Sequence, residues 1–151
     1  MLNLYTLTGW FNRFKLNLII NDKAEIISSQ FTKGNVADNQ ENLLMKLCKD
    51  IFGKLYGDKE KIVKEAEFEK LFHDGVHVIT KIKRNMKTKI MSIYDKIMLR
   101  KRSVIECVID SLKNIYEVIH SRDRGIHEFF INIFSDITAY HLLPKKPSIA
   151  S

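Results

Sequence analysis

The strongest constraint on the fold of this chain is a change of hydrophobic period along its length. Apolar and polar residues alternate from Phe14 to Ile20, which is typical of a half-buried strand. Asn21-Asp22-Lys23 has turn chemistry, and residues 25–31 read as the returning strand of a hairpin. Near the C-terminus the period becomes helical, with one apolar face formed by Ile105, Val108, Ile109, Leu112, Tyr116 and Ile119.

The segments between these two patterns alternate between helix and strand. Helical spacing over residues 43–52 precedes a short strand at 54–57, and a helix over 66–72 has Gly75 as its stop. A strand at 76–82 and a last helix from 126 to 140 complete the order. This order predicts an α/β (α+β) fold with a mixed sheet. A ribonuclease-H-like sheet with flanking helices fits it, lacking its first strand unless that strand is supplied from outside the chain. We expect one domain in residues 1–143 and a tail in residues 144–151.

Positive charge is concentrated in one segment. The whole chain carries a formal net charge of +7, and residues 81–102 hold nine Lys or Arg residues against the single acid Asp95. A basic block in an otherwise near-neutral body favours a polyanion as partner, nucleic acid above a membrane. A lysine-rich surface that is merely solvated is an equally good explanation from charge alone. The candidate DNA contacts are Lys81, Lys83, Arg84, Lys87, Lys89, Arg100 and Lys101.

The two cysteines, Cys48 and Cys107, have neither disulfide nor zinc-site spacing, so we expect a reducing cytoplasm. No apolar run reaches the roughly 18–20 residues that a bilayer requires, and no signal-peptide pattern begins the chain. We therefore expect no membrane partner.

Two carboxylates stand in charged settings. Asp58 follows a strand and precedes Lys59, and Glu106 lies one helical turn after Arg102 and two turns before Lys113. Carboxylates at a strand end and on a facing helix suit a two-metal site for phosphodiester cleavage. An Asp after a Gly is also a common turn residue, and an Arg–Glu pair at i, i+4 is common on exposed helices.

Several motifs, in order along nearly the whole chain, resemble DDE-type insertion-sequence transposases. Leu55-Tyr56-Gly57-Asp58-Lys59 is similar to the motif of the second catalytic acid, and the spacing of Arg102, Glu106 and Lys113 is similar to that of the third. The other matching segments are Gly9-Trp10-Phe11, Phe14-Lys15-Leu16, Ile20-Asn21-Asp22, Glu25-Ile26, Thr32, Gly34-Asn35-Val36, Ser121-Arg122 and Lys145-Lys146-Pro147.

The resemblance implies DNA cleavage at element ends and joining of the freed 3′-hydroxyl to target DNA. It implies Mg²⁺ or Mn²⁺ held by Asp58 and Glu106, with Arg102 and Lys113 orienting Glu106 or contacting DNA. It further implies a bacterial cytoplasmic location and DNA as partner, with a second copy or a full-length transposase as a further candidate.

This chain also departs from the family pattern. Glu60-Lys61 replaces the usual Gly-Tyr, Leu99 stands in place of Tyr, and Arg13 and Asn17 stand in place of Gly and His. The first catalytic acid should precede Gly9, yet no acid occurs before Asp22.

We therefore expect a transposase fragment that is inactive alone. A non-catalytic DNA-binding fragment that modulates a full-length relative, and a remnant without function, are the alternatives. A sheet without its central strand would also be marginally folded and prone to aggregate.

Overall fold

The computed structural model describes residues 3–11, 13–35, 43–57, 65–80, 91–120 and 125–148, with residues 65 and 115–120 described by their backbone alone. The strands are β1 (Asn3–Phe11), β2 (Phe14–Asn21), β3 (Ile26–Lys33), β4 (Gly53–Gly57) and β5 (Val76–Thr80). The helices are α1 (Leu43–Leu47), α2 (Glu65–His73), α3 (Ile93–Arg100), α4 (Ser103–His120) and α5 (Ile126–Leu142).

The five strands form one mixed sheet in the order β3-β2-β1-β4-β5. β1 pairs antiparallel with β2 over eight residue pairs, and β2 pairs antiparallel with β3. β1 also pairs parallel with β4, with Tyr5 opposite Tyr56, and β4 pairs parallel with β5. The predicted hairpin, the strand before Asp58 and the ribonuclease-H-like mixed sheet are therefore confirmed.

The centre of the sheet differs from the sequence prediction. We expected the central strand to be lacking, but β1 of this chain occupies that position between β2 and β4. The sequence prediction missed this strand because Asn3–Phe11 is not a regular alternation of apolar and polar residues. The open centre that was the reason to expect a marginally folded chain is therefore filled.

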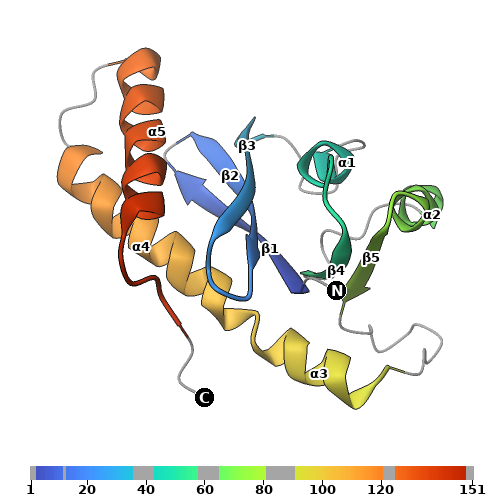
Figure 1. Cartoon of the computed structure of the whole chain (residues 1–151). Coiled ribbons are helices and arrows are strands. Elements are labelled where there is room, and N and C mark those ends of the chain that lie inside the picture. Colours follow the sequence, from blue (N-terminus) through green and yellow to red (C-terminus); the bar gives the residue numbers. More distant parts are fainter. Residues whose placement is uncertain are drawn as a thin grey trace.

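Helices cover both faces of the sheet (Figure 1). On one face a hydrophobic core joins β1 and β2 to α3, α4 and α5, with Tyr5, Leu16, Ile105, Val108 and Ile133 among its buried members. On the other face a smaller core joins the sheet to α1 and α2, and it includes Leu4, Ile19, Leu47, Leu55 and Leu71. Successive residues of a strand point to opposite faces, so Leu4 and Tyr5 serve different cores.

Two local features refine the predicted elements. The helical pattern over residues 43–52 gives a helix only to Leu47, since Asp50 adopts φ +60° and turns the chain into β4. Phe52 is consequently 66% exposed and lies against Gly75. Gly75, with φ +91°, follows α2 as the sequence predicts, in a conformation that favours glycine.

Within the described part of the chain, no helix combines the length and hydropathy needed to cross a bilayer.

Gly9 of β1 controls how closely α4 approaches the sheet. A methyl group at Gly9 would lie 2.8 Å from Cγ2 of Ile109, a buried residue of α4. We expect Gly9→Ala to lower the free energy of unfolding by about 1–3 kcal/mol through overpacking, as measured by urea denaturation. Gly125→Ala is the matched control, because nothing lies within 4 Å of a methyl group there.

A double variant tests this contact directly. Ile109→Ala removes the atoms that a side chain at position 9 would meet, so Gly9→Ala with Ile109→Ala should cost at least about 0.5 kcal/mol less than the two single costs combined. Additive costs would contradict the contact.

Candidate functional site

The carboxyl end of β4 is the part of the sheet nearest to the first candidate carboxylate. β4 ends at Gly57, where a methyl group would lie 3.0 Å from Cγ2 of Thr6 on β1. Asp58 itself lies outside the described residues, so its predicted role as a metal ligand stays a prediction.

α4 runs along β1 on the opposite face from α1 and α2. Met98, shortly before α4, accepts a hydrogen bond of 3.6 Å from the Tyr5 hydroxyl at its Sδ, and Ile109 lies against Gly9. α4 therefore runs in the same direction as β1, and its first turns, which carry Glu106, lie over the part of β1 between Tyr5 and Gly9. Tyr5 is opposite Tyr56 in the strand register, so this part of β1 begins beside the end of β4 at Gly57. This orientation brings the predicted third acid to the end of the sheet at which β4 finishes.

Glu106 is held only loosely. Nη2 of Arg102 lies 3.7 Å from Oε1 of Glu106, and the Glu106 side chain is 55% exposed. An exposed i, i+4 ion pair of this kind contributes about 0.3–0.5 kcal/mol. The predicted proximity of Arg102 to Glu106 is present, and the carboxylate remains accessible to solvent.

Lys113 is half-buried on the same helix. Seven residues of α-helix advance about 10 Å, so Lys113 lies two turns beyond Glu106 and Arg102 is the nearer cation.

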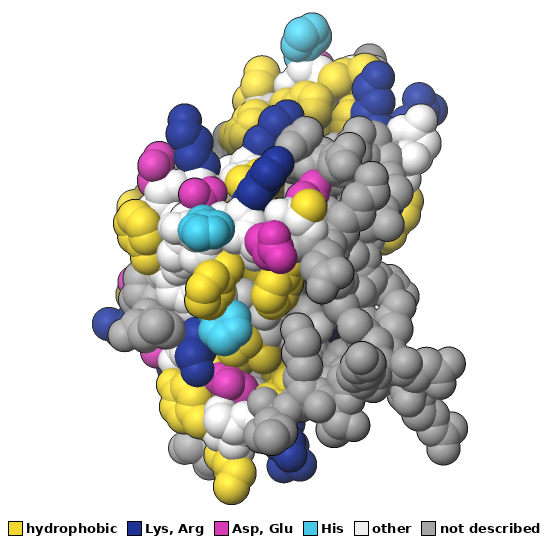
Figure 2. All heavy atoms as spheres, turned by 90° about the vertical axis from the view of Figure 1, so that its right-hand side faces the viewer, with side chains coloured by type: hydrophobic (Ala, Val, Ile, Leu, Met, Phe, Trp, Pro, Cys, Tyr) yellow, Lys and Arg dark blue, Asp and Glu magenta, His cyan; other side chains and the backbone are white. Residues whose placement is uncertain are grey.

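The basic block is only partly described. Lys81, Lys83, Arg84, Lys87 and Lys89 lie outside the described residues, and β5 ends at Thr80, directly before them. Arg100 and Lys101 are exposed where α3 meets α4. On the face seen in Figure 2, the coloured Lys and Arg side chains are interspersed with acidic, histidine and hydrophobic ones.

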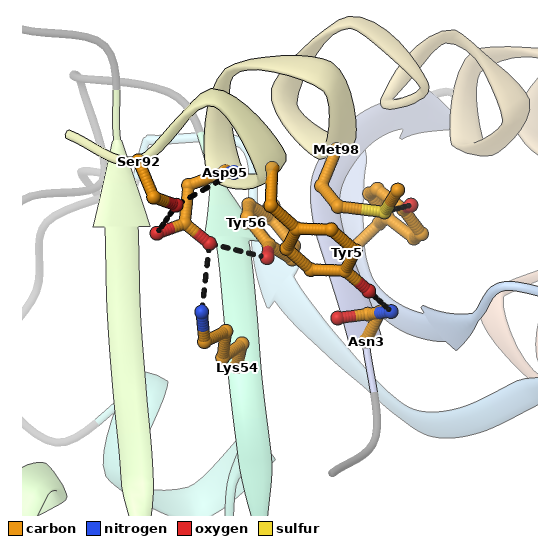
Figure 3. A network of polar contacts seen from close by, with 8 residues as sticks. Asn3, Tyr5, Lys54, Tyr56, Ser92, Asp95 and Met98 are labelled. Atoms are coloured by element: carbon orange, nitrogen blue, oxygen red, sulfur yellow. Dashed lines mark hydrogen bonds and ion pairs between the residues drawn. The ribbon is translucent and has the colours of Figure 1, made fainter.

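A partly buried polar network joins α3 to the sheet (Figure 3). Oδ1 of Asp95 accepts hydrogen bonds from Lys54 Nζ at 2.8 Å and from the Tyr56 hydroxyl at 2.9 Å. Its Oδ2 accepts a hydrogen bond from the Ser92 hydroxyl at 2.8 Å, and Ser92 Oγ in turn accepts from the Asp95 backbone N–H as the N-cap of α3. These contacts fix the start of α3 against β4, at residues three and one before its last residue, Gly57.

The environment of Asp95 stabilises its charged form. Burial alone would raise the pKa of Asp95, but the hydrogen bonds from Lys54, Ser92 and Tyr56 and the Lys54 charge lower it below its ordinary value. Burial and the hydrogen bond to Asp95 raise the pKa of Tyr56, which therefore stays a neutral donor. Burial, with Asp22 and Tyr94 nearby, raises the pKa of Tyr5 to about 12.

Sequence reasoning missed this network and α3 itself. The available signal was Ser92 followed three residues later by Asp95, a helix-start pattern. Its partners Lys54 and Tyr56 are 41 and 39 residues away in sequence, so no local pattern could pair them with Asp95.

The potential metal-ligand side chains of the described residues do not form a complete metal site. Within the described residues, no group of three or more His, Cys, Asp or Glu side chains could hold a metal ion. β1 occupies the centre of the sheet without a single Asp or Glu among its nine residues. The three-carboxylate set that the family resemblance implies therefore lacks a member on this strand.

A mixed sheet in the order 3-2-1-4-5 with helices on both faces defines an α/β protein of ribonuclease-H-like architecture. Residues 5–126 match the family described as "Transposase DDE domain", and the chain belongs to this family.

The fold is also that of a solved integrase domain. The catalytic core domain of BIV integrase superposes with a TM-score of 0.60 at 10% identity, covering 97% of this chain and 86% of that one. No curated protein matches the sequence.

Asp95 should stabilise the fold in a pH-dependent way. We expect Asp95→Ala to lower the free energy of unfolding by about 1–3 kcal/mol at pH 7, since Lys54 and Tyr56 lose their acceptor. Because the folded pKa of Asp95 lies below its unfolded value of about 3.9, this contribution is complete above that value. It is lost as the pH falls through the folded pKa.

Urea denaturation from pH 7 down to about pH 2 measures this difference. Asp110→Ala, which removes an exposed carboxylate of α4, is the control and should change stability by less than about 0.5 kcal/mol. A cost of Asp95→Ala that is the same at every pH would rule out the charged network.

Proposed function

We propose that this chain is a DNA-binding domain of the transposase family that does not cleave DNA on its own. The observation that carries the proposal is β1: it occupies the central position of the sheet and has no carboxylate. Asp58 and Glu106 remain as two candidate ligands of Mg²⁺ or Mn²⁺. Two carboxylates hold a pair of divalent cations less firmly than three, because each cation loses oxygen ligands and charge compensation.

The proposed DNA surface is the basic block from Lys81 to Arg102. Lys81, Lys83, Arg84, Lys87 and Lys89 follow β5, and Arg100 and Lys101 are exposed at the other end of the segment. β5 runs parallel to β4, so Thr80, which directly precedes the block in the sequence, and Gly57, which directly precedes Asp58, lie at the same end of the sheet. Lys and Arg side chains there would neutralise backbone phosphates, while Arg102 and Lys113 would orient Glu106 or contact DNA.

A second candidate function is modulation of a full-length transposase by competition for DNA or by mixed oligomers. It is favoured by the combination of a complete five-stranded sheet with an incomplete set of acids. A folded domain of this kind can occupy DNA without processing it. A bacterial insertion sequence as source, and an origin as a fragment of a longer transposase, belong to the same proposal.

The DNA surface is tested by salt dependence. Replacing Lys83, Arg84, Lys87 and Lys89 by Ala should reduce the magnitude of the slope of log K against log salt by about 3–4 for duplex DNA, since fewer counterions are released. Fluorescence anisotropy of a labelled duplex at several salt concentrations gives this slope. Lys23, Lys46 and Lys49, which are exposed elsewhere, form the control set for replacement by Ala. An unchanged slope in the block variant would place the DNA contacts on another surface.

Metal binding tests the missing acid. Isothermal titration with Mn²⁺ or Mg²⁺ should give only weak binding, and supercoiled DNA should not be nicked in the presence of either ion. Asp58→Ala and Glu106→Ala should each weaken the residual binding further, while Asp74→Ala, an exposed carboxylate after α2, should not. Robust metal-dependent nicking that Asp58→Ala abolishes would show that the chain supplies a third ligand elsewhere.

A further inference from the structure

β1 carries the chain's single tryptophan, Trp10, in an exposed position next to the turn into β2. β1 continues to Phe11, well past the level of Tyr5, which lies opposite Tyr56 near the end of β4. The turn therefore projects beyond the carboxyl end of β4. Trp10 lies beside this turn, is 56% exposed and does not belong to either hydrophobic core.

The Trp10 indole is supported by its neighbours. Lys15 is the direct partner of Trp10 in the strand register, and its Nζ lies 4.9 Å from the centroid of the ring. The far edge of the ring reaches Gly34, where a methyl group would lie 2.8 Å from the Trp10 Cζ3 atom. The Gly34 N–H donates to the Arg13 carbonyl at 2.8 Å, which ties the end of β3 to this turn. The ring is thus held in place while more than half of the residue faces solvent.

The surroundings of Trp10 favour a polar, anionic ligand. Its neighbours on the same face of the sheet are polar: Thr8 donates to Asn17 Oδ1 at 2.7 Å, and Asn17 donates to Thr32 Oγ1 at 3.2 Å. Arg13, in the turn beside Trp10, is exposed, and the largely buried Lys15 holds its charge against the Trp10 ring. Lys33 is exposed at the end of β3, but it pairs with Phe14 and therefore belongs to the opposite face of the sheet from Thr32 and Trp10. Residues 8–17 and 28–35 contain no Asp or Glu. An apolar protein partner would meet few apolar neighbours here.

We propose that Trp10 and the neighbouring cation Arg13 form a binding site for unpaired DNA bases. The indole stacks on a base, and the Arg13 guanidinium meets the adjacent phosphate. An aromatic platform within a positively charged surface is the usual means of holding single-stranded nucleic acid. A base inside a duplex does not offer its face, so the site selects single-stranded or frayed DNA. It is separate from the Lys81–Arg102 block and does not require Asp58 or Glu106 to bind metal.

Fluorescence provides a direct test, since Trp10 is the only tryptophan in the chain. The full-length protein is titrated with a dT oligonucleotide of about 12 nucleotides, an abasic strand of equal length and a blunt hairpin duplex. We expect the dT strand to quench Trp10 fluorescence, and the abasic strand and the duplex to leave it nearly unchanged. The abasic strand carries the same phosphates, so it isolates the contribution of the base.

Variants then separate stacking from charge. Trp10→Ala should weaken dT binding about tenfold, as measured by anisotropy of the labelled strand, and leave binding of the abasic strand unchanged. Trp10→Phe should retain part of the affinity. Arg13→Ala should weaken binding of both strands and reduce the magnitude of the salt slope by about 0.7, as expected for one phosphate contact on a single strand. Phe72→Ala, which removes an exposed aromatic ring elsewhere, is the matched control and should change neither.

Two results would overturn the proposal: equal quenching by the dT and abasic strands, or an unchanged dT affinity in Trp10→Ala. The quenching measurement uses the unmodified protein, so it stands even if a variant folds poorly. A failure of the basic block to bind duplex DNA would leave the quenching by dT intact, and the two proposals therefore fail separately.

Discussion

The pairing of β1 with both β2 and β4 is the interaction on which the rest of the structure depends. β1 contributes an antiparallel ladder on one side and a parallel ladder on the other, so it connects the hairpin to the βαβ half of the sheet. Its alternating residues supply Tyr5 to the core under α4 and Leu4 to the core under α1 and α2. Without this strand the two hydrophobic cores would lose the central strand that contributes residues to both of them. The same pairing fixes the level of Gly57 relative to Gly9, and thereby the position of α4 against the end of β4.

The chain belongs to the transposase DDE family, but its central strand β1 lacks the carboxylate that the family resemblance implies. The chain matches the transposase DDE domain over residues 5–126 and shares the fold of a retroviral integrase core. Its central strand nevertheless presents Thr6, Leu7 and Thr8 near the end of β4, where none of these side chains offers a carboxylate. Hydrophobic and β-branched residues suffice to hold a strand between two others, so the fold does not need the acid.

Polar contacts organise both ends of the region that faces DNA in our proposals. Asp95 joins Ser92 at the start of α3 to Lys54 and Tyr56 on β4, in a setting where its charged form is favoured. At the β1–β2 turn, Lys15 and Gly34 support the exposed ring of Trp10. In the first network Lys54 pairs with Asp95, which is 41 residues away in sequence. At the turn, Lys15 of β2 lies over the Trp10 ring of the neighbouring strand β1. These polar contacts add to the hydrophobic core, which includes Tyr56 and Leu99, in setting the orientation of α3, and they support the ring beside the turn.

The sequence by itself determined the hairpin, the helices α2, α4 and α5, and the mixed sheet, because each has a strong local period or a turn residue such as Gly75. It also carried the motifs around Asp58 and Glu106 that resemble those of the family. Only the tertiary structure decided that Asn3–Phe11 is the central strand, since that role comes from pairing with β2 and β4 and not from its own pattern. The tertiary structure likewise brought Asp95 to Lys54 and left Trp10 exposed. Burial and long-range hydrogen bonds depend on which elements meet in space, and a local period does not record that.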